Sequence, residues 1–224
     1  WLYNHAPNKD EVVVNDRWCK DMGAAHGDYF SSEYQDVENI KEDHPWEESR
    51  GVGGSYGYNR AENLDDYSSS TELIHELIDI VSRGGNLLLN VGPTADGRIP
   101  VIMQQRLVDI GNWLDINGEA IYETHPWGRS GENEQEFIFF TKKDEFVYTA
   151  CTKWPENDIQ LKFEKEVENI TLLGSSKKVT WTSKDGEISI QNPNISPDEM
   201  ETTFAFVFRI ETRPWSLAYS NPEA

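Results

Sequence analysis

The sequence predicts an α/β region that ends near Pro126 and an antiparallel β-sandwich after it. Two observations predict this division. Residues 72–124 read as helix, strand and helix in succession, which is typical of α/β folds. After Pro126, apolar residues recur at every second position in short segments separated by turn residues, which is typical of antiparallel sheets. The predicted domains are residues 1–124 and 128–212, followed by a tail at 213–224.

The clearest elements lie in the helix–strand–helix unit. Apolar residues recur at helical spacing over residues 73–81, and Gly84 and Gly85 follow where a left-handed cap would end the helix. The run NLLLNV comes next, and its unbroken apolar character predicts a strand buried on both faces. After the turn PTADG, Leu107, Ile110, Gly111 and Leu114 mark a second amphipathic helix over about residues 99–117.

The N-terminal part is less regular. Residues 1–7 resemble a helix end, and residues 11–15 (EVVVN) a short buried strand. Residues 19–50 are polar without sustained periodicity, so they predict a long loop with at most one strand, near Tyr29, and long loops are often functional. Residues 52–59 (VGGSYGYN) suggest another strand with glycines that allow close approach.

The second region consists of predicted strands alone. The segment EFIFFTKKDEFVYTACTKW predicts a hairpin, DIQLKFEK a further strand, and ITLLG, KKVTWTSKDGEISIQN and TTFAFVFRI continue the series. Because no helix interrupts these strands, we expect an antiparallel sandwich.

Composition excludes several function classes. The net charge of −20 disfavours a nucleic-acid surface, because phosphate contacts need clustered Lys and Arg. No run of 18 apolar residues predicts a transmembrane helix. Cys19 and Cys151 lie in different predicted domains, so they indicate no disulfide framework. The five histidines lack metal-ligand spacing, and we expect neither a metal nor a cofactor.

Several motifs carry a resemblance to a known family. Four blocks of the sequence closely resemble blocks of α-L-fucosidases of glycoside hydrolase family 29, in the same order. They are VVVNDRWCKDMGAAHGDYFSSEY, PWEESRGVGGSYGYNRAE, GGNLLLNVGPTADGRIP and RLVDIGNWLDINGEAIYET. The resemblance covers roughly residues 1–127 with specific motifs. It implies the C-terminal half of a (β/α)8 TIM-like barrel followed by an antiparallel β-sandwich.

The same resemblance implies a retaining exo-α-L-fucosidase that hydrolyses terminal α-L-fucose from glycans or glycoconjugates. The family's Asp nucleophile is expected on a strand that precedes Trp1, so we expect this chain alone to be inactive; Asp16 matches a different family position. Analogy with the family also implies an extracytoplasmic location, whether periplasmic, lysosomal or secreted. The sequence predicts neither linkage preference nor oligomeric state.

The acid/base residue has two candidates. Glu33, in GDYFSSEY, matches the position with that role in bacterial members of the family, and Glu47, in PWEE, is the alternative because the position varies between family branches. With 40 acidic residues in the chain, a solvated surface charge is the competing interpretation of either glutamate.

Two residues are candidates for substrate binding. Arg17, in NDRW, follows a predicted strand and matches an arginine that contacts fucose in relatives; a structural pair with Asp16 or Asp28 is the alternative. Tyr56, in GSYGYN, matches an aromatic position that packs on the methyl group of fucose, and ordinary barrel packing is its alternative.

Two other functions compete with the enzyme. A carbohydrate-binding module on the sandwich could use Trp154, Trp181 and Tyr148 as a sugar platform, although the alternation in FVYTACTKW predicts that several of these rings point inward. The other rival is a non-catalytic structural segment.

Overall fold

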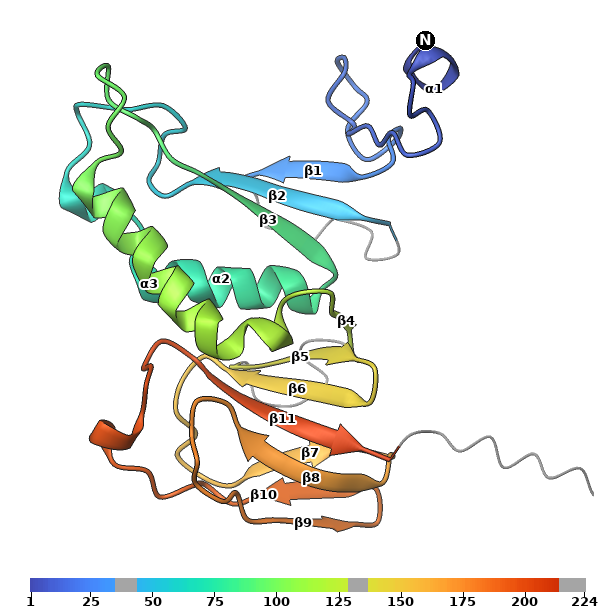
Figure 1. Cartoon of the computed structure of the whole chain (residues 1–224), viewed down its shortest axis with the longest axis vertical. Helices are drawn as coiled ribbons and strands as arrows, with labels where there is room; N and C mark the ends of the chain where they lie inside the picture. Colours follow the sequence, from blue (N-terminus) through green and yellow to red (C-terminus); the bar gives the residue numbers. More distant parts are fainter. Residues whose placement is uncertain (35–43, 129–136, 214–224) are drawn as a thin grey trace, which may run out of the picture. The chain divides into compact units, whose positions relative to one another are not determined.

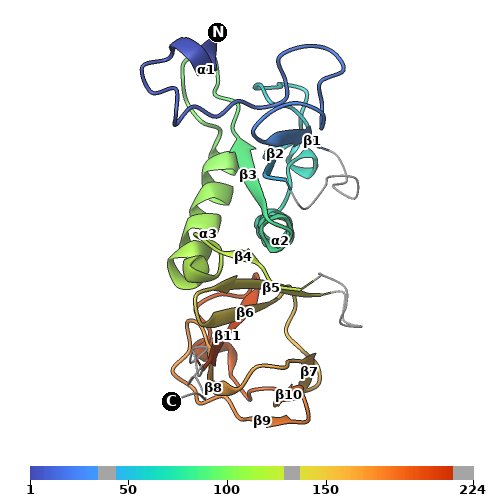
Figure 2. The ribbon, with the colours of Figure 1, turned by 90° about the vertical axis from the view of Figure 1, so that its right-hand side faces the viewer.

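The computed structural model describes residues 1–34, 44–128 and 137–213. The chain divides into two units, Trp1–Asp115 and Ile116–Ala224, which differ in fold class (Figure 1, Figure 2). Among the described residues, no helix is long and apolar enough to cross a membrane.

The first unit is built on a parallel sheet. Its strands are β1 (Phe30–Glu33), β2 (Trp46–Gly51) and β3 (Gly85–Asn90), in that spatial order. Phe30 pairs with Trp46, and Trp46 pairs with Gly85. A parallel bridge between Asn15 and Tyr29 extends the pairing ahead of β1, after the short helix α1 (Leu2–His5).

The helices α2 (Ser70–Ser82) and α3 (Val101–Asn117) follow the predicted positions, and a 3-10 turn η2 (Leu64–Asp66) precedes them. Ser69 and Glu72 form a reciprocal capping box that starts α2. Gly84 ends it at φ +80°, as the sequence predicts. Gly85 is needed for another reason, because a Cβ there would lie 2.4 Å from the Trp46 ring.

Apolar residues gather on the helix-covered face of this sheet. Phe30 and Trp46 pack with Ile80 of α2. Val52, which follows β2, packs with Leu73 of α2 and Met103 of α3. Figure 1 shows α2 and α3 on the same side of the three strands.

Three predictions for the N-terminal part were wrong. Residues 19–50 are no continuous loop, because β1 and β2 lie within them. Residues 52–59 form no strand and instead follow the end of β2 as irregular chain. In residues 11–15 only Asn15 takes part in strand pairing. The loop prediction failed because β1 and β2 carry polar residues on both faces, which removes the apolar alternation that normally marks a strand.

The burial of β3 also differs from the prediction. Only the side of β3 that faces the helices is covered, and Leu88 on the other side is 45% exposed. The apolar run therefore predicted β3 correctly and its double burial wrongly.

The predicted apolar positions of α3 differ as well. Leu107 and Gly111, which marked this helix in the sequence, are exposed, whereas Met103 and Trp113 are buried.

The second unit confirms the predicted antiparallel sandwich. After η3 (Gly118–Ala120), one sheet has the order β4-β5-β6-β11-β8 and the other β7-β10-β9. Fifteen buried apolar residues form the core between them, among them Phe163 and Phe208. The only helical element described after residue 130 is the 3-10 turn η4 (Pro197–Glu199). The strands are β4 (His125–Pro126), β5 (Ile138–Lys143), β6 (Phe146–Cys151), β7 (Ile159–Lys162), β8 (Val167–Leu172), β9 (Trp181–Lys184), β10 (Glu187–Ile190) and β11 (Phe206–Thr212).

The two cysteines offer a direct test of the folded state. Cys19 is exposed, whereas Cys151 is buried in the sandwich core and burial raises the pKa of its thiol to about 12. Because the thiolate is the reactive form, we expect a disulfide reagent at pH 8 to modify one thiol per native chain and two after unfolding. Two fast-reacting thiols in the native chain would contradict the sandwich core described here.

Candidate active site

The face of the parallel sheet that points away from α2 carries most of the polar side chains predicted to act. Strand alternation sends Phe30 and Trp46 toward α2, so their neighbours in β1 and β2 point to the opposite side. The parallel register places Ser31 beside Glu47 and Glu33 beside Ser49. We call this side the site face; its strand residues are Ser31, Glu33, Glu47, Ser49, Asn86, Leu88 and Asn90.

Arg17 and Glu33 form an ion pair at the end of β1. Arg17 Nη1 lies 2.9 Å from Glu33 Oε1, and the two side chains are 39% and 46% exposed. The guanidinium also donates from Nε to Ser31 Oγ at 2.6 Å and from Nη2 to the Ser31 carbonyl at 3.3 Å. An exposed pair of this kind contributes little to stability. The ion pair instead orients the Arg17 side chain, because together with the two hydrogen bonds to Ser31 it holds the guanidinium on the site face.

Asp16 and Asp28, the alternative partners of Arg17, bind other donors. Asp16 is buried and accepts hydrogen bonds from the Ala24 amide at 2.8 Å and from the Ser31 amide and hydroxyl at 3.0 and 2.7 Å. Asp28 accepts from the Tyr3 hydroxyl and the Val14 amide, each at 2.7 Å. Both aspartates therefore stabilise the chain ahead of β1.

The environment of Asp16 keeps it ionised. Burial acts to raise the pKa of this carboxyl, but the hydrogen bonds from Ala24 and Ser31 outweigh burial and lower the pKa below its ordinary value. Ser31 thus donates to Asp16 while it accepts from Arg17. The Ser31 hydroxyl therefore links the Arg17 guanidinium to the ionised Asp16 carboxylate through two hydrogen bonds.

Glu47 lies on the same face, one strand further into the sheet. Its side chain is half-buried in β2, and burial raises its pKa above the ordinary value, whereas the nearby positive charge of Arg17 acts to lower it. A raised pKa is the property that a general acid requires. Both candidate glutamates are therefore strand residues within the influence of Arg17.

The neighbouring Glu48 has a different environment. It is buried on the helix-covered side and accepts a hydrogen bond from Ser32 of β1. Arg50, two residues further along β2, pairs with Glu76 of α2. These polar groups pair with one another between the sheet and the helix, so they belong to the structure beneath the site face.

Tyr56 follows the carboxyl end of β2. Its hydroxyl donates to the Ser49 carbonyl at 2.6 Å, and its own carbonyl accepts from Asn90 Nδ2 at 2.5 Å. Its ring meets that of Tyr34 edge to face, with centroids 5.2 Å apart. The tyrosine is therefore tied to β2 and β3, next to the strand residues of the site face.

Sequence reasoning missed Ser31 and Tyr34. Ser31 connects Arg17 to Asp16, and Tyr34 contacts Tyr56. A signal was available in GDYFSSEY, because Ser31 and Glu33 alternate with Phe30 and Ser32 as strand residues do.

A family model described as "Alpha-L-fucosidase" matches residues 1–119, which include the sheet, both helices and the site face. The chain belongs to the α-L-fucosidase family. A second model, "Alpha-L-fucosidase C-terminal domain", matches residues 131–211, which include most of the sandwich.

Curated α-L-fucosidases resemble the chain along nearly its whole length. Human tissue α-L-fucosidase is 40% identical over 216 residues, which cover 94% of this chain and 46% of the relative. Rat plasma α-L-fucosidase is 38% identical over 232 residues, which cover 99% of this chain and 48% of the relative. The chain thus spans about half the length of the curated relatives it matches.

Solved fucosidase structures share the fold. A Thermotoga maritima α-fucosidase in complex with fucose superposes with a TM-score of 0.72 at 30% identity, covering 93% of this chain and 46% of the other. Isoenzyme 1 from Paenibacillus thiaminolyticus, at 24% identity, has a TM-score of 0.75 over 90% of this chain and 50% of the other. The predicted fold class, part of a TIM-like barrel followed by a β-sandwich, is confirmed.

The sandwich does not present the three rings proposed as a sugar platform. Tyr148 is buried, with its pKa raised to about 12 chiefly by burial. Trp154 stands edge-on to Phe206 with centroids 4.8 Å apart, and Trp181 packs against the core. Trp154 and Trp181 therefore pack against the sandwich core, whereas Tyr148 is buried on the other face of β6.

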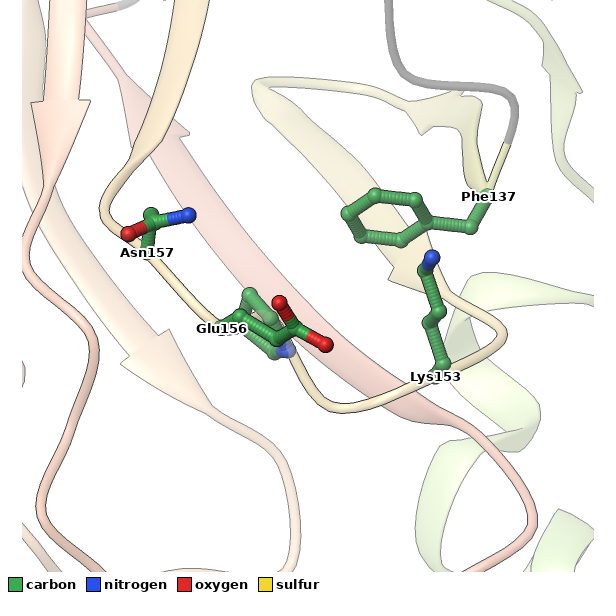
Figure 3. Close-up of a pocket in the computed structure, with 5 residues that line it drawn as sticks. Phe137, Lys153, Glu156 and Asn157 are labelled. Atoms are coloured by element: carbon green, nitrogen blue, oxygen red, sulfur yellow. The ribbon is translucent and has the colours of Figure 1, made fainter.

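Among the described residues of the sandwich, a hollow at the end of β6 is a further candidate for a sugar site. It measures about 220 Å³ and is lined by Phe137, Lys153, Pro155, Glu156 and Asn157 (Figure 3). This volume is smaller than that of typical small-molecule sites. The Lys153 ammonium lies 4.5 Å from the Phe137 ring centroid, so it occupies a face on which a sugar could stack.

In the described ranges, no group of three or more His, Cys, Asp and Glu side chains is arranged to hold a metal ion.

Proposed function

We propose that the protein carrying this segment is a retaining exo-α-L-fucosidase that removes terminal α-L-fucose from glycans or glycoconjugates. The observation that carries the proposal is the Arg17–Glu33 pair beside Glu47 on the site face. Membership of the α-L-fucosidase family supports it, as does likeness to a fold relative described in complex with fucose.

The proposed mechanism assigns the acid/base role to Glu33. In the first step, protonated Glu33 gives its proton to the leaving oxygen while an attacking carboxylate forms a bond to the anomeric carbon. In the second step, ionised Glu33 takes a proton from water, and the water oxygen displaces that carboxylate. The attacking group is the Asp that the family resemblance implies on a strand preceding Trp1. Glu47 is the alternative acid/base, supported by its raised pKa.

Arg17 and Tyr56 are the proposed sugar contacts. The planar fork of Arg17 suits bidentate donation to sugar oxygens, and its link to Ser31 fixes the direction of the fork. The ring of Tyr56 offers an apolar surface for the methyl group of fucose. The net charge of −20 suits a neutral glycan better than a nucleic acid.

An extracytoplasmic location belongs to the same proposal. Its support is that similar proteins include tissue and plasma α-L-fucosidases. Secretion of the full-length protein into the medium of a producing cell line would test it, and retention of all activity in the cytosol would contradict it.

The activity is tested in a protein of full family length that contains this segment. We expect it to hydrolyse 4-nitrophenyl α-L-fucoside and to release fucose first as the α-anomer, detected by proton NMR. In the same protein, Arg17→Ala should lower kcat/KM for all fucosides alike by roughly 10- to 100-fold, because a hydrogen bond to a charged group contributes about 1.5–3 kcal/mol.

Two further variants define the role of Arg17. Arg17→Lys keeps a positive charge for Glu33 but removes the planar fork, so most of the loss should remain if the fork binds the sugar. Arg213→Ala is the matched control, because it removes an arginine that is 58% exposed and pairs with Glu166 on the sandwich. Initial release of the β-anomer, or no hydrolysis of α-L-fucosides, would refute the proposed function.

A further inference from the structure

The proposed roles of Glu33 and Tyr56 leave open what holds these two residues in place. Glu33 is the last residue of β1 and is 46% exposed, and Tyr56 lies in irregular chain after β2. Tyr34, which directly follows Glu33, contacts the segment that carries Tyr56. It has no role in the mechanism proposed above.

The backbone of Tyr34 has an unusual conformation. Its φ is +50°, in the left-handed region that residues other than glycine seldom adopt. Such a conformation persists only when surrounding contacts hold it, and it is found most often at functional sites. The turn at Tyr34 ends β1 directly after Glu33, so it fixes the point at which the Glu33 side chain leaves the sheet.

The hydroxyl of Tyr34 ties this turn to the carboxyl end of β2. It accepts a hydrogen bond from the Gly51 amide at 2.7 Å and donates to the Gly53 carbonyl at 3.2 Å. The fit is close, because a Cβ on Gly51 would lie 2.7 Å from this hydroxyl and 2.6 Å from the Ser55 carbonyl oxygen. One hydroxyl thus connects the ends of two adjacent parallel strands.

The ring of Tyr34 adds two contacts. It meets the Tyr56 ring edge to face at 5.2 Å and 72°, and the Arg50 guanidinium lies 5.5 Å from its centroid. Arg50 is itself paired with Glu76 of α2, so the ring is connected to the helix layer beneath the sheet. Tyr34 therefore touches the strand that carries Glu47, the candidate methyl contact Tyr56, and a fixed arginine.

We infer that Tyr34 is a positioning residue that holds the Glu33 carboxylate and the Tyr56 ring in one arrangement at the carboxyl ends of β1 and β2. This inference rests on the proposed function, because it assumes that Glu33 is the acid/base. Tyr34 acts through Glu33 and Tyr56 and takes no part in proton transfer itself.

The test uses the full-length protein with two substrates, an alkyl α-L-fucoside with a poor leaving group and a dinitrophenyl α-L-fucoside with an activated one. Tyr34→Phe keeps the ring and removes the hydroxyl. We expect kcat/KM to fall roughly 10- to 100-fold for the alkyl fucoside, because small misplacement of a catalytic group has effects of this size. For the activated substrate the loss should be below about threefold.

A merely structural role would lower both values equally, so the ratio of kcat/KM between the substrates is the readout. Tyr34→Asn is the second variant, because Asn tolerates a left-handed φ and keeps the turn while removing both ring and hydroxyl. Its ratio should change at least as much as that of Tyr34→Phe. Tyr122→Phe, which removes an exposed tyrosine hydroxyl of the other unit, should leave the ratio unchanged.

A double variant separates this inference from the proposed function. If Tyr34 acts through Glu33, Tyr34→Phe should change the ratio no further in a Glu33→Ala background. An equal change in both backgrounds, or an unchanged ratio in Tyr34→Asn, overturns the positioning role and leaves the role of Glu33 intact. A Glu33→Ala protein with the wild-type ratio overturns both.

Discussion

Glu33→Ala, in a protein of full family length, is expected to slow the hydrolysis of fucosides with poor leaving groups by about 10²- to 10⁴-fold, the contribution typical of general acid catalysis. Activated aryl fucosides should lose far less in the first step, because their leaving oxygen needs no proton. Their second step still needs a base to activate water. Added azide should therefore restore turnover and yield fucosyl azide, which is measured by chromatography.

The comparison with Glu47→Ala decides between the two candidates. If Glu33 is the acid/base, Glu47→Ala should be mild, although burial raises the pKa of Glu47. Glu123→Ala is a neutral control, because that side chain is 83% exposed and pairs with Lys143. Azide rescue in Glu47→Ala and none in Glu33→Ala would reverse the assignment, and mild effects in both would transfer the role to another residue.

The 224-residue chain by itself is expected to show no fucosidase turnover, a loss of several orders of magnitude relative to enzymes that typically turn over at about 1–10³ per second. The reason is geometric. Retention requires two carboxyl groups about 5–5.5 Å apart across the sugar. In the part of the chain that the structure describes, the sheet of the first unit has three strands, whereas a closed barrel has eight.

The measurement is the release of nitrophenol from 4-nitrophenyl α-L-fucoside by the purified chain. The thiol count described above serves as the control for folding, because a protected Cys151 reports an intact sandwich. Turnover comparable with that of a full-length relative would contradict the prediction and would direct attention to a nucleophile on the site face itself.

The prediction of a long loop over residues 19–50 failed for a physical reason. The strand β2 was missed, and β1 was anticipated only as a possible strand near Tyr29, because the residues of both strands are polar on both faces. On the helix-covered side, Glu48 accepts a hydrogen bond from Ser32 and Arg50 pairs with Glu76, so polar groups occupy positions where apolar ones mark a strand. On the site face the polar residues are the candidate catalytic groups.

The sequence by itself determined the elements whose causes are local. The capping box of Ser69 and Glu72, the left-handed Gly84 and the apolar run before residue 92 specify α2 and β3 without reference to the rest of the chain. Alternation after Pro126 specified the sandwich in the same way, and ordered motifs specified the family.

Only the tertiary structure decided how the candidate residues meet. The sequence offered Asp16 and Asp28 as acidic partners of Arg17, but the fold brought Arg17 to Glu33 while backbone amides and hydroxyls bound both aspartates. Tyr34 gained its contacts from a left-handed turn and from the end of the neighbouring strand. Such contacts depend on parallel register between segments about 15 residues apart, which no local pattern encodes.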